Sequence, residues 1–156
     1  MKLSKNLSLS EFVRSNTAKR RGIDNTPKGE HLDAAKTLAE TIFQPIREHF
    51  ATPIFISSGY RSAALNEAIG GSKTSQHSKG EAIDIDMDGR RGPDNEDVFY
   101  FIKDNLDFDQ LIWEFGTDER PDWVHVSYNY DGAQRGQILV AKRNSKGKVY
   151  YENYNG

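Results

Sequence analysis

Residues 75–86 read SQHSKGEAIDID: a histidine in a polar loop that ends at a glycine, followed by an alternating apolar run. In a β-strand, side chains change face at every residue, so Ile83 and Ile85 share one face and Asp84 and Asp86 share the other. Two carboxylates near an imidazole indicate a metal site, because these are ligand types that suit zinc. The same pattern also fits solvated residues on the outer face of an antiparallel sheet. This stretch alone leaves both interpretations open.

The composition of the chain is that of a globular domain. Its 156 residues are 36% hydrophobic and 28% charged, with a formal net charge of -2 and no cysteine. This length fits one domain with a real core, so we expect a single domain over residues 1–156. The acidic balance gives no field that favours nucleic acid, and no nucleic-acid partner is expected. The lack of cysteine excludes disulfides, a thiol nucleophile and cysteine-based zinc sites.

The N-terminal residues show no signal peptide, because they lack both a continuous apolar core and a small-residue cleavage site. No apolar run approaches the ~20 residues that a membrane span needs. We therefore expect no membrane partner.

The first third of the chain predicts helices. A Ser-x-x-Glu capping box at residues 8–11 predicts a short helix over 8–15. An irregular basic connection is expected over 17–26. Apolar residues at helical spacing then predict a long helix from Pro27 to Phe50. Pro45 lies inside this helix and should kink or split it.

The rest of the chain predicts strands with helices between them. Strands are predicted over 52–58, 82–87, 110–115 and 123–128, helices over 62–69 and from Asp94 or Asn95 to Leu106, and a hairpin from 137–140 and 148–151. The order indicates an α+β domain, a central antiparallel sheet with helices packed against it. The motif-bearing core spans about residues 8–130, and the C-terminal hairpin spans 131–156.

A zinc site needs a third ligand besides His77 and Asp84. His31 and His49 lie on the long helix, where surface or boundary positions are the default. His125 lies in an alternating strand, on the face opposite its valines. Such a histidine is more often structural, but with His77 and Asp84 it completes two imidazoles and one carboxylate. This set leaves a position open for water, as catalytic zinc sites do.

Hydrolysis also needs a base, which takes a proton from water and passes it to the leaving amine. Asp122 precedes His125 by three residues and could be this base, although it also fits a turn residue beside Pro121. Glu114 is the competitor. A carboxylate in so apolar a strand must be solvent-facing, paired or functional.

Arg61 follows Gly59 at a predicted strand end. Its planar guanidinium could hold a substrate carboxylate or polarise a carbonyl, and it could equally form a surface ion pair.

Several motifs together resemble the zinc D-alanyl-D-alanine carboxypeptidase family, which includes vancomycin-resistance carboxypeptidases and dipeptidases and phage L-alanyl-D-glutamate endolysins. They are Ser58-Gly59-Tyr60-Arg61-Ser62, Leu65-Asn66, Gly70-Gly71-Ser72, Ser75-x-His77-x-x-Gly80-x-Ala82-x-Asp84, Leu106-Asp107-Phe108-Asp109-Gln110-Leu111-Ile112 and Trp123-Val124-His125-Val126-Ser127-Tyr128.

The resemblance implies a Hedgehog/DD-peptidase-like fold with Zn²⁺ bound by His77, Asp84 and His125. It implies that Asp122 is the general base and that Arg61 contacts the scissile carbonyl or nearby substrate. Ser75, Tyr60 and Trp123 are expected to bind substrate. Asp122 departs from the glutamate of some relatives, and Trp123 replaces a histidine found in others, so Glu114 remains a second candidate for the base.

The implied function is hydrolysis of amide bonds in peptidoglycan stem peptides, by a D-Ala-D-Ala carboxypeptidase or an endolysin that works as a monomer. The alternative is a catalytically silent zinc-binding module that recognises the cell wall. Family resemblance also suggests a phage lysis protein, made in the host cytoplasm and released to the cell wall by a holin.

Overall fold

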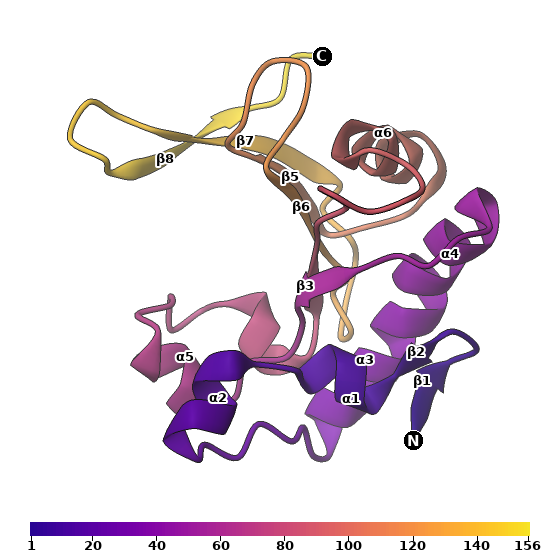
Figure 1. The fold of residues 1–156 in the computed structure, drawn as a ribbon, viewed down its shortest axis with the longest axis vertical. Coiled ribbons are helices and arrows are strands. Elements are labelled where there is room, and N and C mark those ends of the chain that lie inside the picture. The colour runs from indigo at the N-terminus through magenta and orange to yellow at the C-terminus, as the bar shows by residue number, and fades with distance from the viewer.

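Alternation of apolar and polar residues gives the central sheet two different faces. The structure, a computed structural model of residues 1–156, shows the helices of residues 30–50 and 95–105 on one face of this sheet (Figure 1). The face toward the helices is buried and apolar. It consists of Ile83, Ile85, Leu111, Trp113, Val124 and Val126. The polar residues between them, Asp84 and His125 among them, therefore lie on the opposite face.

The elements begin with two short strands, after which most helices come first and most strands last, with α5 and α6 between strands. They are β1 Lys2–Ser4, β2 Leu7–Ser8, α1 Leu9–Val13, α2 Asn16–Arg21, α3 Glu30–Leu38, the π-helical turn η1 Ala39–Phe43, α4 Gln44–Phe50, β3 Ile56–Ser58, α5 Ala63–Ala68, the 3₁₀ turn η2 Gln76–Lys79, β4 Ala82–Ile85, α6 Asn95–Asn105, β5 Gln110–Glu114, β6 Trp123–Ser127, β7 Gln137–Arg143 and β8 Val149–Asn153. This arrangement confirms the predicted α+β class.

The six-stranded sheet has the order β3-β4-β6-β5-β7-β8 and is mixed. All neighbours are antiparallel except β5 and β7, which are parallel. The prediction of an antiparallel sheet was therefore wrong for this pair. The chain after β6 returns to the start of β5, where the backbone N–H of Gln137 donates to the carbonyl of Asp109 at 3.0 Å. Strand β7 consequently starts beside the start of β5 and runs in the same direction.

The long helix from Glu30 to Phe50 is continuous rather than split at Pro45. Proline lacks an N–H and clashes with the carbonyl four residues earlier, here that of Thr41. The π-helical turn η1 relieves this conflict, because the N–H of Gln44 donates to the carbonyl of Ala39, five residues back.

Two local elements differ from the sequence predictions. The expected irregular connection contains helix α2, because the Ser15 side chain caps the N–H of Ala18 and Gly22 closes the helix in the left-handed conformation. Residues 2–8 form the small β1–β2 hairpin, which the sequence did not predict.

The core consists of 23 buried residues that join the sheet to the helices. They include Phe12 of α1, Ile42 of η1 and Phe99 of α6. Phe99 packs edge-on against Trp113 of β5, with ring centroids 5.0 Å apart. None of the helices has the length and apolar character of a membrane-spanning segment.

Candidate metal centre

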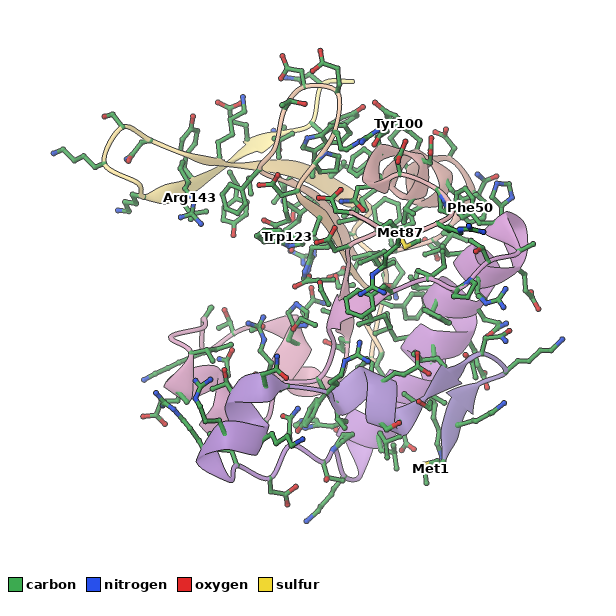
Figure 2. The ribbon with its side chains drawn as sticks, in the orientation of Figure 1. Met1, Phe50, Met87, Tyr100, Trp123 and Arg143 are labelled. Carbon is green, nitrogen blue, oxygen red and sulfur yellow. The ribbon has the colours of Figure 1, made fainter.

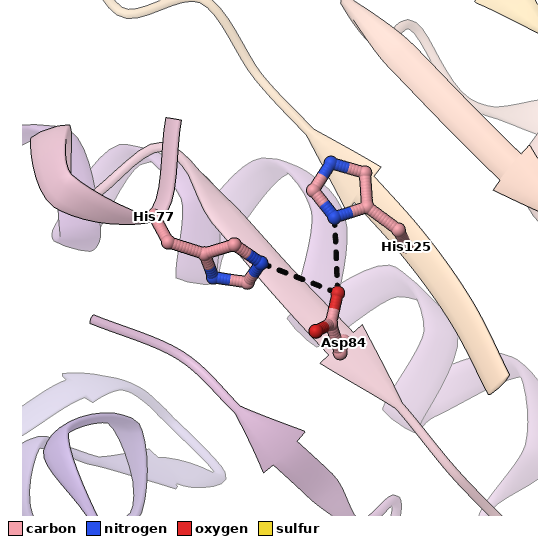
Figure 3. A group of neighbouring side chains, drawn as sticks. All are labelled: His77, Asp84 and His125. Carbon is pink, nitrogen blue, oxygen red and sulfur yellow. Dashed lines mark hydrogen bonds and ion pairs between the residues drawn. The ribbon is translucent and has the colours of Figure 1, made fainter. Parts of the chain in front are cut away.

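His77, Asp84 and His125 meet on the polar face of the sheet (Figure 3). Each offers one ligand atom, and these atoms lie within 4.8 Å of one another. The Asp84 Oδ1 atom is 2.9 Å from His125 Nδ1 and 3.3 Å from His77 Nε2. Two imidazole nitrogens and one carboxylate oxygen in this arrangement fit a transition-metal ion.

The register of β4 and β6 places two of the three candidate ligands beside each other. Asp84 lies directly opposite His125 in the antiparallel pair. Directly opposed side chains share a face and have Cβ atoms about 4.5–5.5 Å apart. A register shift of one residue would turn one of the two side chains to the apolar face.

His77 comes from the loop before β4, and two hydrogen bonds fix it. The backbone N–H of His77 donates to Ser75 Oγ at 3.2 Å at the start of η2. The imidazole Nδ1 lies 2.7 Å from the carbonyl oxygen of Gly59. A carbonyl can only accept, so Nδ1 carries a proton, which leaves Nε2, the nitrogen facing Asp84, as the atom that would bind a metal ion once it is deprotonated.

Asp84 remains ionised in this environment. Burial by itself would raise the pKa of its carboxyl, but the charge of His77 and hydrogen bonds from His125 and His77 outweigh burial and hold the pKa well below its usual range. A metal ligand must be deprotonated, so the state of Asp84 suits this role.

The three residues line a cleft of about 1150 Å³. Its walls come from the segment 61–81 on one side and from the β7–β8 hairpin on the other, with β5 and β6 as its floor. The cleft is large enough for several residues of a peptide.

Glu114 lies in this cleft, although only 8% of its surface is exposed. It is diagonal to His125 across the β5–β6 pair, because Glu114 faces Trp123 and Ile112 faces His125. Burial raises the pKa of Glu114 to about 7; Asp84 raises it too, while His125 and Arg143 lower it. A carboxyl that titrates near neutral pH beside a metal site is suited to proton transfer.

Asp122 lies outside this cleft. It precedes β6 with the same alternation as Val124, so its position belongs to the helix-covered face. Its exposed side chain lines a neighbouring hollow that shares Phe115, Trp123 and Arg143 with the cleft. Its charge, like that of Asp86, adds to burial in raising the pKa of Asp88. The structure thus does not bring Asp122 together with the three candidate ligands.

Arg61 lies at the edge of the cleft, and its backbone is hydrogen-bonded to that of the candidate ligand His77. Its N–H donates to the carbonyl of His77 at 3.1 Å. The Arg61 Nε atom is buried without a hydrogen-bond partner. Burial lowers the pKa of Arg61, and Asp84 opposes that shift. A buried donor without a partner calls for an explanation, and a functional role of Arg61 would supply one.

The remaining predicted residues separate into two groups. Ser75 and Trp123 line the cleft, and Ser75 also caps η2. Tyr60 does not line it; its buried ring places the hydroxyl 3.0 Å from His31 Nδ1, beneath the site. Asp86, which shares a face with Asp84 in the sequence pattern, accepts from Asn95 Nδ2 at 3.1 Å.

Sequence reasoning assigned no role to Asp109, although it belongs to a quoted motif. Asp109 is 3% exposed and accepts two-pronged hydrogen bonds from Arg135, at 3.1 and 2.8 Å, and one from Gln76 at 3.0 Å. It therefore ties the 129–136 loop to the residue before His77. The signal was a carboxylate beside an apolar strand, the same signal that pointed to Glu114.

The family model described as Peptidase M15 matches residues 5–127 of the chain. The matched range includes the three candidate ligands, Arg61 and Glu114, and ends before the β7–β8 hairpin. No curated protein matches the chain.

Proposed function

The chain belongs to the peptidase M15 family, and from this premise we propose that it is a zinc-dependent peptidase that hydrolyses amide bonds in peptidoglycan stem peptides. The observation that carries the proposal is the cluster of His77, Asp84 and His125 at the floor of an open cleft. The hydrogen bond from His77 to Gly59 supports the zinc assignment, because orienting bonds of this kind accompany metal-ligating histidines.

The three clustered side chains would hold the zinc ion. When bound, zinc polarises a carbonyl and lowers the pKa of a water molecule to about 7.

Glu114 is the base in this proposal. Its ionised carboxylate takes a proton from the attacking water, whose oxygen forms a bond to the carbonyl carbon. The carbon–nitrogen bond then breaks, and Glu114 returns the proton to the amine nitrogen that leaves. Glu114 suits this role better than Asp122, because it shares the cleft with the ligands and its pKa is about 7.

Arg61 supplies a fixed positive charge at the edge of the cleft. Its backbone hydrogen bond to His77 places it next to the ligands, and its Nε has no partner within the chain. We propose that Arg61 donates to the oxygen of the amide that is cleaved, where negative charge develops.

The test compares Glu114→Gln with Asp122→Asn in zinc-loaded protein, with release of amines from purified peptidoglycan as the readout. Glu114→Gln should lower the rate about 10²–10⁴-fold and leave zinc content unchanged. Asp122→Asn should stay within about threefold of the wild type, because surface substitutions away from the site have small effects. The reverse ranking would overturn the assignment of the base.

His77→Ala and Asp84→Ala provide the second arm, with zinc content measured alongside activity. Both should lose zinc and activity together. Wild-type protein that binds zinc and cell wall but releases no amine would instead support the silent recognition module.

A further inference from the structure

The β7–β8 hairpin supplies one wall of the cleft and lies outside the range matched by the family. Its contribution consists of Arg143, Val149 and Tyr151. Figure 2 shows Arg143 on the hairpin and Trp123 on β6 projecting toward the same open side of the molecule. The family match therefore assigns no role to this wall.

Arg143 rests on an aromatic platform. Its guanidinium carbon lies 4.5 Å above the ring centroid of Phe115, and Trp123 packs edge-on against the same ring at 5.4 Å. Phe115 has a φ of 57°, which is rare for a bulky residue. Such strained residues concentrate at functional sites, and here the unusual backbone follows directly after Glu114.

The guanidinium of Arg143 forms no ion pair, although its charge lowers the pKa of Glu114. Its one side-chain hydrogen bond runs to the carbonyl of Gly147 at 3.3 Å, and none of the ion pairs in the structure includes it. The neighbouring Lys142 is paired with Glu152 at 2.9 Å. Within the cleft, Arg135 is already held by Asp109. Arg143 therefore has free donors facing the cleft.

Arg143 lies on the same face of the sheet as the proposed base. Glu114, Ala141 and Tyr151 form one row across β5, β7 and β8, and Arg143 follows Ala141 by two residues on β7. Glu114, Tyr151 and Arg143 all line the cleft, whereas Ala141 is fully buried. A carboxylate that pairs with Arg143 would therefore lie in the cleft on the side of Glu114.

We infer that Arg143, seated on Phe115, binds a carboxylate of the substrate, and that the peptidase prefers peptides with a free carboxylate close to the cleaved bond. This inference rests on the proposed function. Arginine matches a carboxylate with two parallel hydrogen bonds, and the stacked ring holds the guanidinium plane in place. The carboxylate has two possible sources in stem peptides: the C-terminus, or the free α-carboxylate of an internal glutamate linked through its side chain.

The experiment uses matched peptide pairs that differ only in one carboxylate. One pair is an acetylated peptide ending in D-alanyl-D-alanine and its C-terminal amide. The other is an L-alanyl-D-glutamyl peptide and its form with the α-carboxylate amidated. Wild-type protein should cleave the acid of one pair at least about tenfold more efficiently than its amide.

Arg143→Gln should lower kcat/KM for that acid about tenfold more than for its amide, mainly through KM. Arg143→Lys should retain part of the preference, because it keeps the charge but not the fork. Lys146→Gln is the matched control, since it removes the same charge from the exposed turn of the same hairpin. The pair that responds identifies the source of the carboxylate.

Calorimetric binding of the same peptides to Glu114→Gln protein, with and without Arg143→Gln, gives a readout that does not depend on turnover. A wild type that cleaves neither pair would contradict the proposed function, and the binding arm would still test Arg143. Equal affinity for acid and amide in both peptide pairs would overturn the inference about Arg143 and leave the proposed function standing. Equal losses for acid and amide on introducing Arg143→Gln would have the same meaning.

Discussion

Glu114 carries its carboxyl group in an almost fully enclosed position, diagonal to His125 on the neighbouring strand. In the metal-free protein its pKa is raised from 4.5 to about 7, chiefly by burial. Between these two pH values the folded protein holds a proton that the unfolded chain has released. The free energy of unfolding should therefore fall as pH rises through this window, by at most about 3 kcal/mol, and level off above it.

Urea unfolding of metal-free protein at pH 5 and pH 8 tests this expectation. Glu114→Gln removes the titrating group and should remove most of the fall in stability. Asp84 does not interfere, because its pKa is lowered and its contribution is lost only at more acidic pH. Identical pH slopes in wild type and Glu114→Gln would contradict the expected origin of the effect.

Residue alternation separates the two candidates for the base. The rule that places His125 opposite its valines also assigns Asp122 to the side of Val124, three residues before His125. In the sequence, alternation therefore places Asp122 as clearly as it places His125. The environment of Glu114, by contrast, depends on Asp84 and Arg143, which are distant along the chain, and no local pattern could supply it.

At the scale of elements, the end of β3 contacts both the N-terminal helix α1 and the candidate metal centre. A methyl group on Gly59 would lie 2.2 Å from the carbonyl oxygen of Phe12, which also accepts from the N–H of Tyr60. The carbonyl of Gly59 itself orients His77. The close packing of β3 against α1 therefore sets the direction of a candidate metal ligand.

Gly59→Ala should force β3 away from α1 and disturb that orientation. We expect a loss of about 1–3 kcal/mol in the free energy of unfolding. Zinc affinity should fall about 10–100-fold, as it does when partners of ligating histidines are changed. Gly132→Ala is the matched control, because its added methyl would meet only the Asn129 side chain, at 3.2 Å. Unfolding in denaturant and competition with a metal chelator give the two measurements, and equal effects in both variants would contradict the role of Gly59.

Local patterns predicted most elements, because their signals lie within a few residues. The capping box at Ser8 and the alternation in β4 and β6 are examples. Helix α2 escaped prediction because its six residues have no apolar periodicity, and its stability comes from caps at both ends. The π-helical turn was missed for a different reason: the rule for Pro45 describes the conflict and not the way it is relieved.

At the scale of the whole molecule, three distant segments converge on the candidate metal centre, so a metal ion bound there should stabilise the entire fold. Free zinc at 1,000 times its dissociation constant adds about 4 kcal/mol to the free energy of unfolding. For a chain of this size that corresponds to a rise in Tm of roughly 10 °C. Thermal unfolding with zinc and with excess chelator measures the difference.

Two aspartates on β4 and just after it provide the control for this measurement. Asp84→Ala should abolish the zinc-dependent rise in Tm. Asp86→Ala should retain it, because Asp86 bonds to Asn95 and lies outside the ligand cluster. The opposite result would move the metal to Asp86.

Long-range pairing was the part of the architecture that the sequence could not supply. Nothing local distinguishes a parallel β5–β7 pair from an antiparallel one, because the choice depends on where the chain after β6 returns. The same pairing carries the C-terminal hairpin to the cleft. The sequence therefore predicted the hairpin as an element and missed Arg143 and Tyr151 as residues of the cleft wall.

The single pairing of β7 with β5 also has an evolutionary consequence. The residues proposed to hydrolyse the substrate lie between 61 and 125, while the hairpin joins the sheet only through β5. Substitutions, insertions or exchange of the hairpin leave the β4–β6 register that places His125 opposite Asp84 unchanged. Under the proposed function, changes in the exposed part of the hairpin would alter the preferred substrate while the residues proposed to hydrolyse it stay in place.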